Sequence, residues 1–75
     1  MGITDDIADE LALKALALEG ETGDEAIVKK VAEILGASSQ TTQEAYLTSV
    51  RVRRAEARAH TYLNGIESKN DGSSS

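Results

Sequence analysis

The chain contains no cysteine, proline, phenylalanine or tryptophan, and it has a single histidine, His60. Without cysteine there is no disulfide framework, no thiolate nucleophile and no cysteine-based metal site. One histidine also excludes a metal site built on two histidines. The composition therefore argues against the commonest redox and metal-binding functions.

Large apolar side chains are scarce as well. Apolar residues make up 40% of the chain, but eleven of them are alanine and the only aromatic residues are two tyrosines. Alanine contributes little buried area, and a domain of 75 residues buries a modest fraction of its surface. We therefore expect the fold to be completed by a partner or by a second copy of the chain.

Charge is divided unevenly along the chain. Residues 1–36 hold nine acids and three bases, whereas residues 37–75 hold four acids and five bases, which gives a net charge of −5. The apolar run from Leu11 to Leu18 contains Lys14 and is too short to cross a bilayer. The N-terminus also lacks the order of a signal peptide. We expect a cytoplasmic protein that does not bind membranes.

The pattern of apolar residues predicts an all-α fold, a small three-helix bundle with a long C-terminal helix. Its helices are expected near residues 5–19, 23–35 and 41–64. Helices joined by such short loops normally pack as antiparallel or sharply angled neighbours. We expect one helical domain over residues 1–66 and a flexible, disordered tail over residues 67–75.

Capping signals support these limits. Thr22 and Glu25 have the spacing of a capping box, and Thr41 and Glu44 have it again before the third helix. Glycines 20, 36 and 65 follow the three expected helices, where a left-handed residue commonly ends a helix.

The third helix carries two apolar strips, separated on one side by arginines. The wider strip, expected to pack against the other two helices, comprises Ala45, Thr48, Val52, Ala55, Ala59, Tyr62, Leu63 and Ile66. The narrower strip comprises Tyr46, Val50 and Ala57. One small core does not need two apolar strips, so we expect the narrower one to serve a homo-oligomer or another partner.

These features predict a non-enzymatic protein-binding module: a regulator, inhibitor or adaptor that occupies a surface of a larger protein. The arginines and the narrower strip are expected to form its contact surface. The predicted partner-binding residues are Tyr46, Leu47, Val50, Arg51, Arg54 and Arg58.

The alternative is a helix-turn-helix DNA-binding transcriptional regulator. Ala32 lies four residues before Gly36, which matches the small residue packed between the two helices of that motif. The net negative charge, Thr42 at a position that normally holds a buried aliphatic residue, and Glu44 near the proposed groove oppose this alternative. The candidate DNA-binding residues are Ser38, Ser39, Gln40, Gln43, Arg51, Arg53 and Arg54.

No catalytic, cofactor-binding or metal-binding residues are expected. The serines lack a nearby base, and a surface pair of Glu56 with His60 at helical spacing explains the histidine. An acidic cluster near the N-terminus offers weak cation ligands at most, and compensation of the helix dipole accounts for it. That cluster comprises Asp5, Asp6, Asp9 and Glu10.

Overall fold

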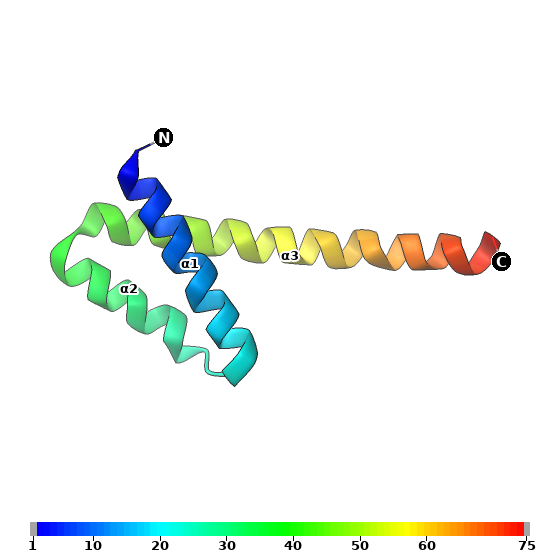
Figure 1. Cartoon of the computed structure of the whole chain (residues 1–75), viewed down its shortest axis with the longest axis horizontal. Helices are drawn as coiled ribbons and strands as arrows, with labels where there is room; N and C mark the ends of the chain where they lie inside the picture. Colours follow the sequence, from blue (N-terminus) through cyan, green and yellow to red (C-terminus); the bar gives the residue numbers. More distant parts are fainter. Residues whose placement is uncertain (1, 75) are drawn as a thin grey trace.

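The computed structural model describes residues 2–74. Within these residues the chain forms three α-helices, α1 (Ile3–Thr22), α2 (Ala26–Ser38) and α3 (Gln40–Ser74). Helices α1 and α2 form an antiparallel hairpin that packs on the first half of α3, and the second half of α3 extends beyond the hairpin (Figure 1). The prediction of an all-α fold with a long C-terminal helix is confirmed.

The turn between α1 and α2 lies later than predicted. Gly20 is inside α1, and Gly23 ends the helix in the left-handed conformation, with φ of 74°. The N–H of Gly23 donates to the Glu19 carbonyl at 2.8 Å. The Thr22 hydroxyl donates to the Leu18 carbonyl, and Asp24 accepts from the N–H of Ala26. Thr22 therefore closes α1, and Asp24 instead caps the start of α2.

The connection between α2 and α3 is a single residue, Ser39. Helix α2 passes through Gly36, and the N–H of Ser39 donates to the Leu35 carbonyl at 2.8 Å. The Ser39 hydroxyl oxygen accepts from the N–H of Thr42 at 3.2 Å, which is the geometry of a helix N-cap. Ser39 therefore starts α3, and the prediction that Thr41 would do so was wrong.

Helix α3 continues beyond Gly65, where the sequence predicted its end, and reaches Ser74. A glycine ends a helix when it adopts a left-handed conformation, and among the described residues only Gly23 has a positive φ. Gly65 in a helical conformation weakens the helix without ending it. The flexibility of residues 67–75 stays a prediction, and Ser75 lies outside the described residues.

The core is small, and alanine dominates it. Helix α1 contributes only alanines at its fully buried positions, so it lies close to its neighbours. Among the side chains that the structure describes, Tyr46 is the one large side chain that is completely buried, and its hydroxyl donates to the Val28 carbonyl at 2.8 Å. The buried core residues are Ala8, Ala12, Ala15, Val28, Ala32, Tyr46 and Val50.

The two apolar strips of α3 have roles opposite to those predicted. Tyr46 and Val50, from the narrower strip, are buried in the core. From Val52 onward the wider strip is exposed, with Val52 exposed by 60%, Tyr62 by 68%, Leu63 by 56% and Ile66 by 42%, whereas Ala45 at its start packs against the core. Tyr46 is buried because its phenol ring fills the space that the small alanines of α1 leave, whereas the later residues of both strips are exposed because they lie beyond the hairpin.

Removing the Tyr46 ring should have a large effect on stability. We expect Tyr46→Ala to lower the free energy of unfolding by about 3–5 kcal/mol, because it opens a cavity in an alanine-rich core. Tyr46→Phe keeps the ring and loses one hydrogen bond, so it should cost about 1 kcal/mol. Urea denaturation followed by circular dichroism measures both, and equal costs would contradict the assigned role of the ring.

Stability should also fall at alkaline pH. Burial raises the pKa of Tyr46 above its ordinary value of 10.0, so folding favours the neutral phenol. This contribution is complete below pH 10 and is lost as pH rises through the pKa of the folded state. We expect Tyr46→Phe to lose less stability than the wild type between pH 9 and 11, as measured by thermal melts across that range.

Candidate functional site: a groove between α2 and α3

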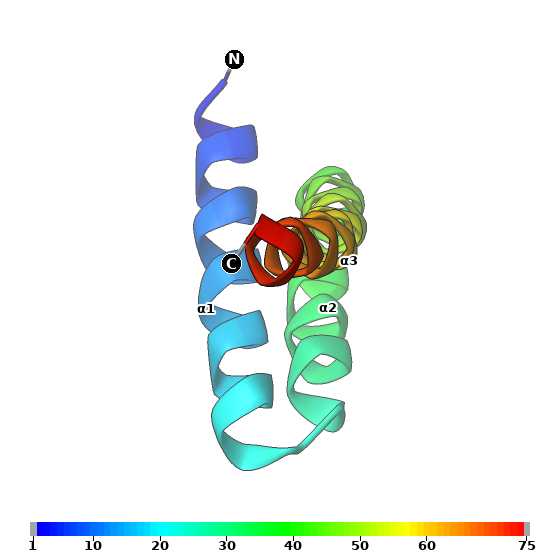
Figure 2. The same cartoon turned by 90° about the vertical axis from the view of Figure 1, so that its right-hand side faces the viewer.

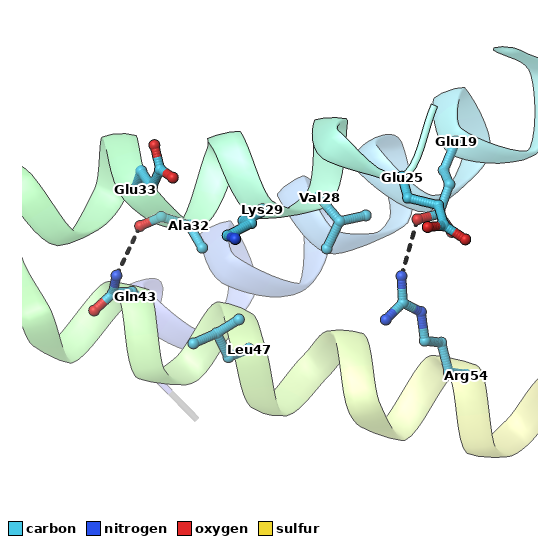
Figure 3. A pocket seen from close by; sticks show the side chains of 9 residues that line it. All are labelled: Glu19, Glu25, Val28, Lys29, Ala32, Glu33, Gln43, Leu47 and Arg54. Atoms are coloured by element: carbon cyan, nitrogen blue, oxygen red, sulfur yellow. Dashed lines mark hydrogen bonds and ion pairs between the residues drawn. The ribbon is translucent and has the colours of Figure 1, made fainter. Parts of the chain in front are cut away.

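A groove with a volume of about 750 Å³ runs between α2 and α3. Its floor is apolar, with Val28 and Ala32 from α2 and the half-buried Leu47 from α3 (Figure 3). Charged and polar side chains form its rim and ends. The lining residues are Glu19, Glu25, Val28, Lys29, Ala32, Glu33, Gln43, Leu47 and Arg54.

Two interactions cross the groove, one at each end (Figure 3). The Gln43 side-chain amide donates to the Ala32 carbonyl at 2.9 Å. At the other end, Nη2 of Arg54 donates to Oε2 of Glu19 at 2.9 Å. The stretch of α3 between Gln43 and Arg54 is roughly 16 Å long, about three helical turns. These interactions brace α3 against α2 and α1 at the two ends of the groove.

Gly36 has a packing role here. A Cβ atom at this position would collide with the side-chain amide of Gln43. The absence of a side chain at Gly36 therefore lets Gln43 reach the backbone of α2. The prediction that Gly36 is a left-handed helix end was wrong, because it lies inside α2.

The two sides of the groove differ in charge. The α2 side carries Glu25, Lys29 and Glu33, whereas the α3 side carries Arg54. Arg58 lies one turn beyond Arg54 on the same side of α3. Within the part of the chain that the structure describes, the exposed Arg58 side chain forms no ion pair. The groove is therefore apolar at its floor, mostly acidic along α2 and basic along α3.

The structure separates the six predicted partner-binding residues into three pairs. Leu47 and Arg54 line the groove, and Arg51 and Arg58 are exposed beside it. Tyr46 and Val50 are buried, so their assignment to a partner surface was wrong. Sequence reasoning missed the contribution of Glu19, Val28 and Ala32, since no pattern within α3 marks contacts with distant helices.

Most of the candidate DNA-binding residues are engaged inside the molecule. Ser39 caps α3, and Gln43 binds the backbone of α2. Arg53 and Arg54 form ion pairs with α1. The remaining candidates, Ser38, Gln40 and Arg51, are exposed.

A bidentate ion pair joins α1 to α3. Nη2 of Arg53 lies 2.7 Å from Oδ2 of Asp9, and Nε of Arg53 donates to Oδ1 at 3.2 Å. The hydrogen bond from Arg53 lowers the pKa of Asp9, and Asp9 in turn raises the pKa of Arg53. Arg53 and His60 also lie near Glu56, at 3.4 Å and 3.6 Å. Within the N-terminal acidic cluster, Asp9 therefore has a structural role, which is to hold α1 against α3.

Metal-binding and membrane-spanning features were searched for across the described residues. There, no three or more histidine, cysteine or acidic side chains are grouped closely enough to hold a metal ion. None of the helices within the same residues has both the length and the apolar character that crossing a bilayer requires. Comparison with protein families, curated proteins and solved structures finds no match to this chain.

The ion pair of Asp9 should appear in a pH titration. A lowered pKa in the folded state means that this pair adds stability above the ordinary value of 3.8, and that the stability is lost as pH falls through the folded-state pKa. We expect ¹³C NMR of the side-chain carboxyls to give Asp9 a pKa below that value, and Arg53→Gln to bring it back. An unchanged Asp9 titration in Arg53→Gln would contradict this pairing.

Proposed function

We propose that this protein is a non-enzymatic protein-binding module that docks an amphipathic helix of a larger protein in the groove between α2 and α3. The observation that carries the proposal is a groove about three turns long, with an apolar floor between two charged rims. Helix-in-groove recognition uses such a surface, with apolar side chains placed every three or four residues.

The rim charges define the chemistry of this partner helix. Acidic side chains on one flank would face Arg58 and Arg54 of α3. Basic side chains on the other flank would face Glu33 of α2 and Glu25, which directly precedes α2. Arg58 is the stronger contributor to binding, because Arg54 already pairs with Glu19. A module of this kind acts as a regulator, inhibitor or adaptor by occupying a surface of its partner.

The helix-turn-helix alternative has less support. Direct reading of DNA bases needs exposed side chains at the start of the second helix of the motif. Here the amide of Gln43 binds the Ala32 carbonyl and the hydroxyl of Ser39 caps α3. The alternative nevertheless predicts a clear outcome in the experiment below, since DNA-mediated capture would be sensitive to nuclease.

The groove can be tested by affinity capture from a native lysate with and without nuclease. We expect Leu47→Gln/Arg58→Glu to reduce partner recovery about tenfold, because it places an amide on the apolar floor and reverses a rim charge. A matched control is Leu13→Gln/Lys14→Glu, which makes the same types of change at exposed positions of α1. The control should recover the partner as the wild type does.

Leu47 is half-buried, so Leu47→Gln could itself disturb folding. The single variant Arg58→Glu, compared with Lys14→Glu, therefore tests the rim charge without changing Leu47. Circular dichroism should show the same helix content for both single variants. The proposal would be contradicted if Arg58→Glu and Leu47→Gln/Arg58→Glu both recovered as much partner as the wild type does. Recovery that disappears with nuclease would replace it with the DNA-binding alternative.

A further inference from the structure

We infer that the face of α3 turned away from the hairpin is a second interface, where a second copy of this chain docks in parallel to form a homodimer. This outer stripe comprises Val52, Ala55, Ala59, Tyr62, Leu63 and Ile66. All six residues are exposed, and the four large ones are exposed by 42% to 68%. The inference does not depend on the groove, which lies elsewhere on α3.

The outer stripe and the core face are on opposite sides of α3. Tyr46 and Val50 point into the core, and a helix turns by about 100° per residue. This rotation places the middle of the outer stripe roughly 170° from them. Figure 2, viewed along α3, shows α1 to one side of α3 and α2 below it, with no other described helix on the far side. A second chain can therefore approach the stripe without displacing the hairpin.

The spacing of the stripe is that of a coiled-coil seam. Val52, Ala55, Ala59, Tyr62 and Ile66 alternate at intervals of three and four residues, which are the a and d positions of a heptad repeat. Leu63 lies next to this seam. The small side chains of Ala55 and Ala59 allow two helices to approach closely, and the larger residues around them supply buried area.

The second half of α3 also lacks the packing that normally stabilises a helix. Every residue from 54 to 69 is exposed. Arg53 and Arg54, at the start of this half, form ion pairs with α1. Helices that make no tertiary contacts are marginal at this length, and Gly65 weakens this one further. A helix that runs alongside the stripe for roughly 20 Å would supply the missing burial.

Charge complementarity indicates that the helix alongside the stripe is α3 of a second copy of this chain. In the same heptad register Arg51 occupies a g position and Glu56 the following e position. In a parallel dimer each Arg51 faces Glu56 of the partner subunit, which gives two symmetry-related ion pairs. An antiparallel arrangement that pairs Ala59 with Ala55 of the partner subunit instead places Arg58 against Arg58 of the partner subunit. The charges therefore favour the parallel arrangement.

Within one chain, Arg51 and Glu56 remain available for ion pairs with a partner subunit. Arg51 is exposed and forms no ion pair with any other described residue. Glu56 lies near Arg53 and His60 only at 3.4 Å and 3.6 Å, with half of its side chain exposed. Its carboxylate can accept a further donor without breaking the short Arg53–Asp9 pair.

Sedimentation velocity from 1 to 200 µM tests the dimer and its charge pairs. The wild type should dimerise at tens of micromolar. Arg51→Glu and Glu56→Arg should each weaken dimerisation about tenfold, because two attractive pairs become repulsive. The double variant Arg51→Glu/Glu56→Arg restores opposite charges and should recover most of the affinity. Thermal melts of each variant report any loss of monomer stability from the changed contacts of Glu56.

Orientation is tested separately by disulfide crosslinking, since the chain has no native cysteine. In a parallel dimer Ile66→Cys places two thiols opposite each other, so oxidation at 50 µM should yield a covalent dimer. Ile34→Cys is the matched control, because Ile34 is exposed on α2 and should crosslink poorly. A wild type that stays monomeric to 200 µM would overturn the inference, and so would crosslinking of Ile66→Cys no better than the control.

The proposed dimer interface and the proposed groove can be tested independently of each other. Leu47→Gln/Arg58→Glu changes no a or d position, so it should still dimerise while losing its larger partner. Val52→Asp/Ile66→Asp should lose dimerisation and keep its groove residues intact. Loss of dimerisation in the first variant to the same extent as in the second would show that the two surfaces are not separate, which contradicts the inference.

Discussion

The seating of Tyr46 against the alanines of α1 is the constraint on which the rest of the structure depends. Helix α1 offers a row of alanines, so only a large side chain from another helix can fill the space beside it. Tyr46 does so completely, and its hydroxyl is fixed by the Val28 carbonyl of α2. One side chain thus contacts the α1 surface and binds α2. Because a helix is rigid about its axis, seating this ring also fixes the direction of every other side chain of α3.

The ion pairs then set how α1 crosses α3. Asp9 and Glu19 lie roughly 15 Å apart along α1, but their partners Arg53 and Arg54 are adjacent on α3. Adjacent residues point about 100° apart, so their long side chains reach toward opposite ends of α1. This geometry suits a helix that crosses α3 at an angle, as in Figure 1, better than one aligned along it. The crossing confines α1 to the first half of α3 and leaves the second half without cover.

The sequence predicted the number and type of helices because capping residues and apolar spacing are local signals. It misplaced helix ends at Gly20, Gly36 and Gly65, because a glycine ends a helix only where the chain adopts a left-handed turn. It also reversed the two strips of α3, since a helical wheel gives relative directions and not which one faces inward. For the site, it selected Leu47 and Arg54 as partner-binding residues, and both line the groove, although their binding of a partner stays a prediction. It missed Glu19 and Val28, whose place in the groove depends on contacts between helices.

The two proposed interfaces would have a joint consequence if both exist. The groove flanks α3 on the side of α2, whereas the outer stripe faces away from the hairpin, so a parallel dimer would carry two grooves at the same end of the assembly. A partner with two suitable helices would then bind the second one as an intramolecular event, and its apparent affinity would rise without any new contact. Dimerisation at tens of micromolar would make this gain depend on protein concentration. The scarcity of large side chains in the core is consistent with such an assembly, since the apolar residues that the monomer leaves exposed would become buried only there.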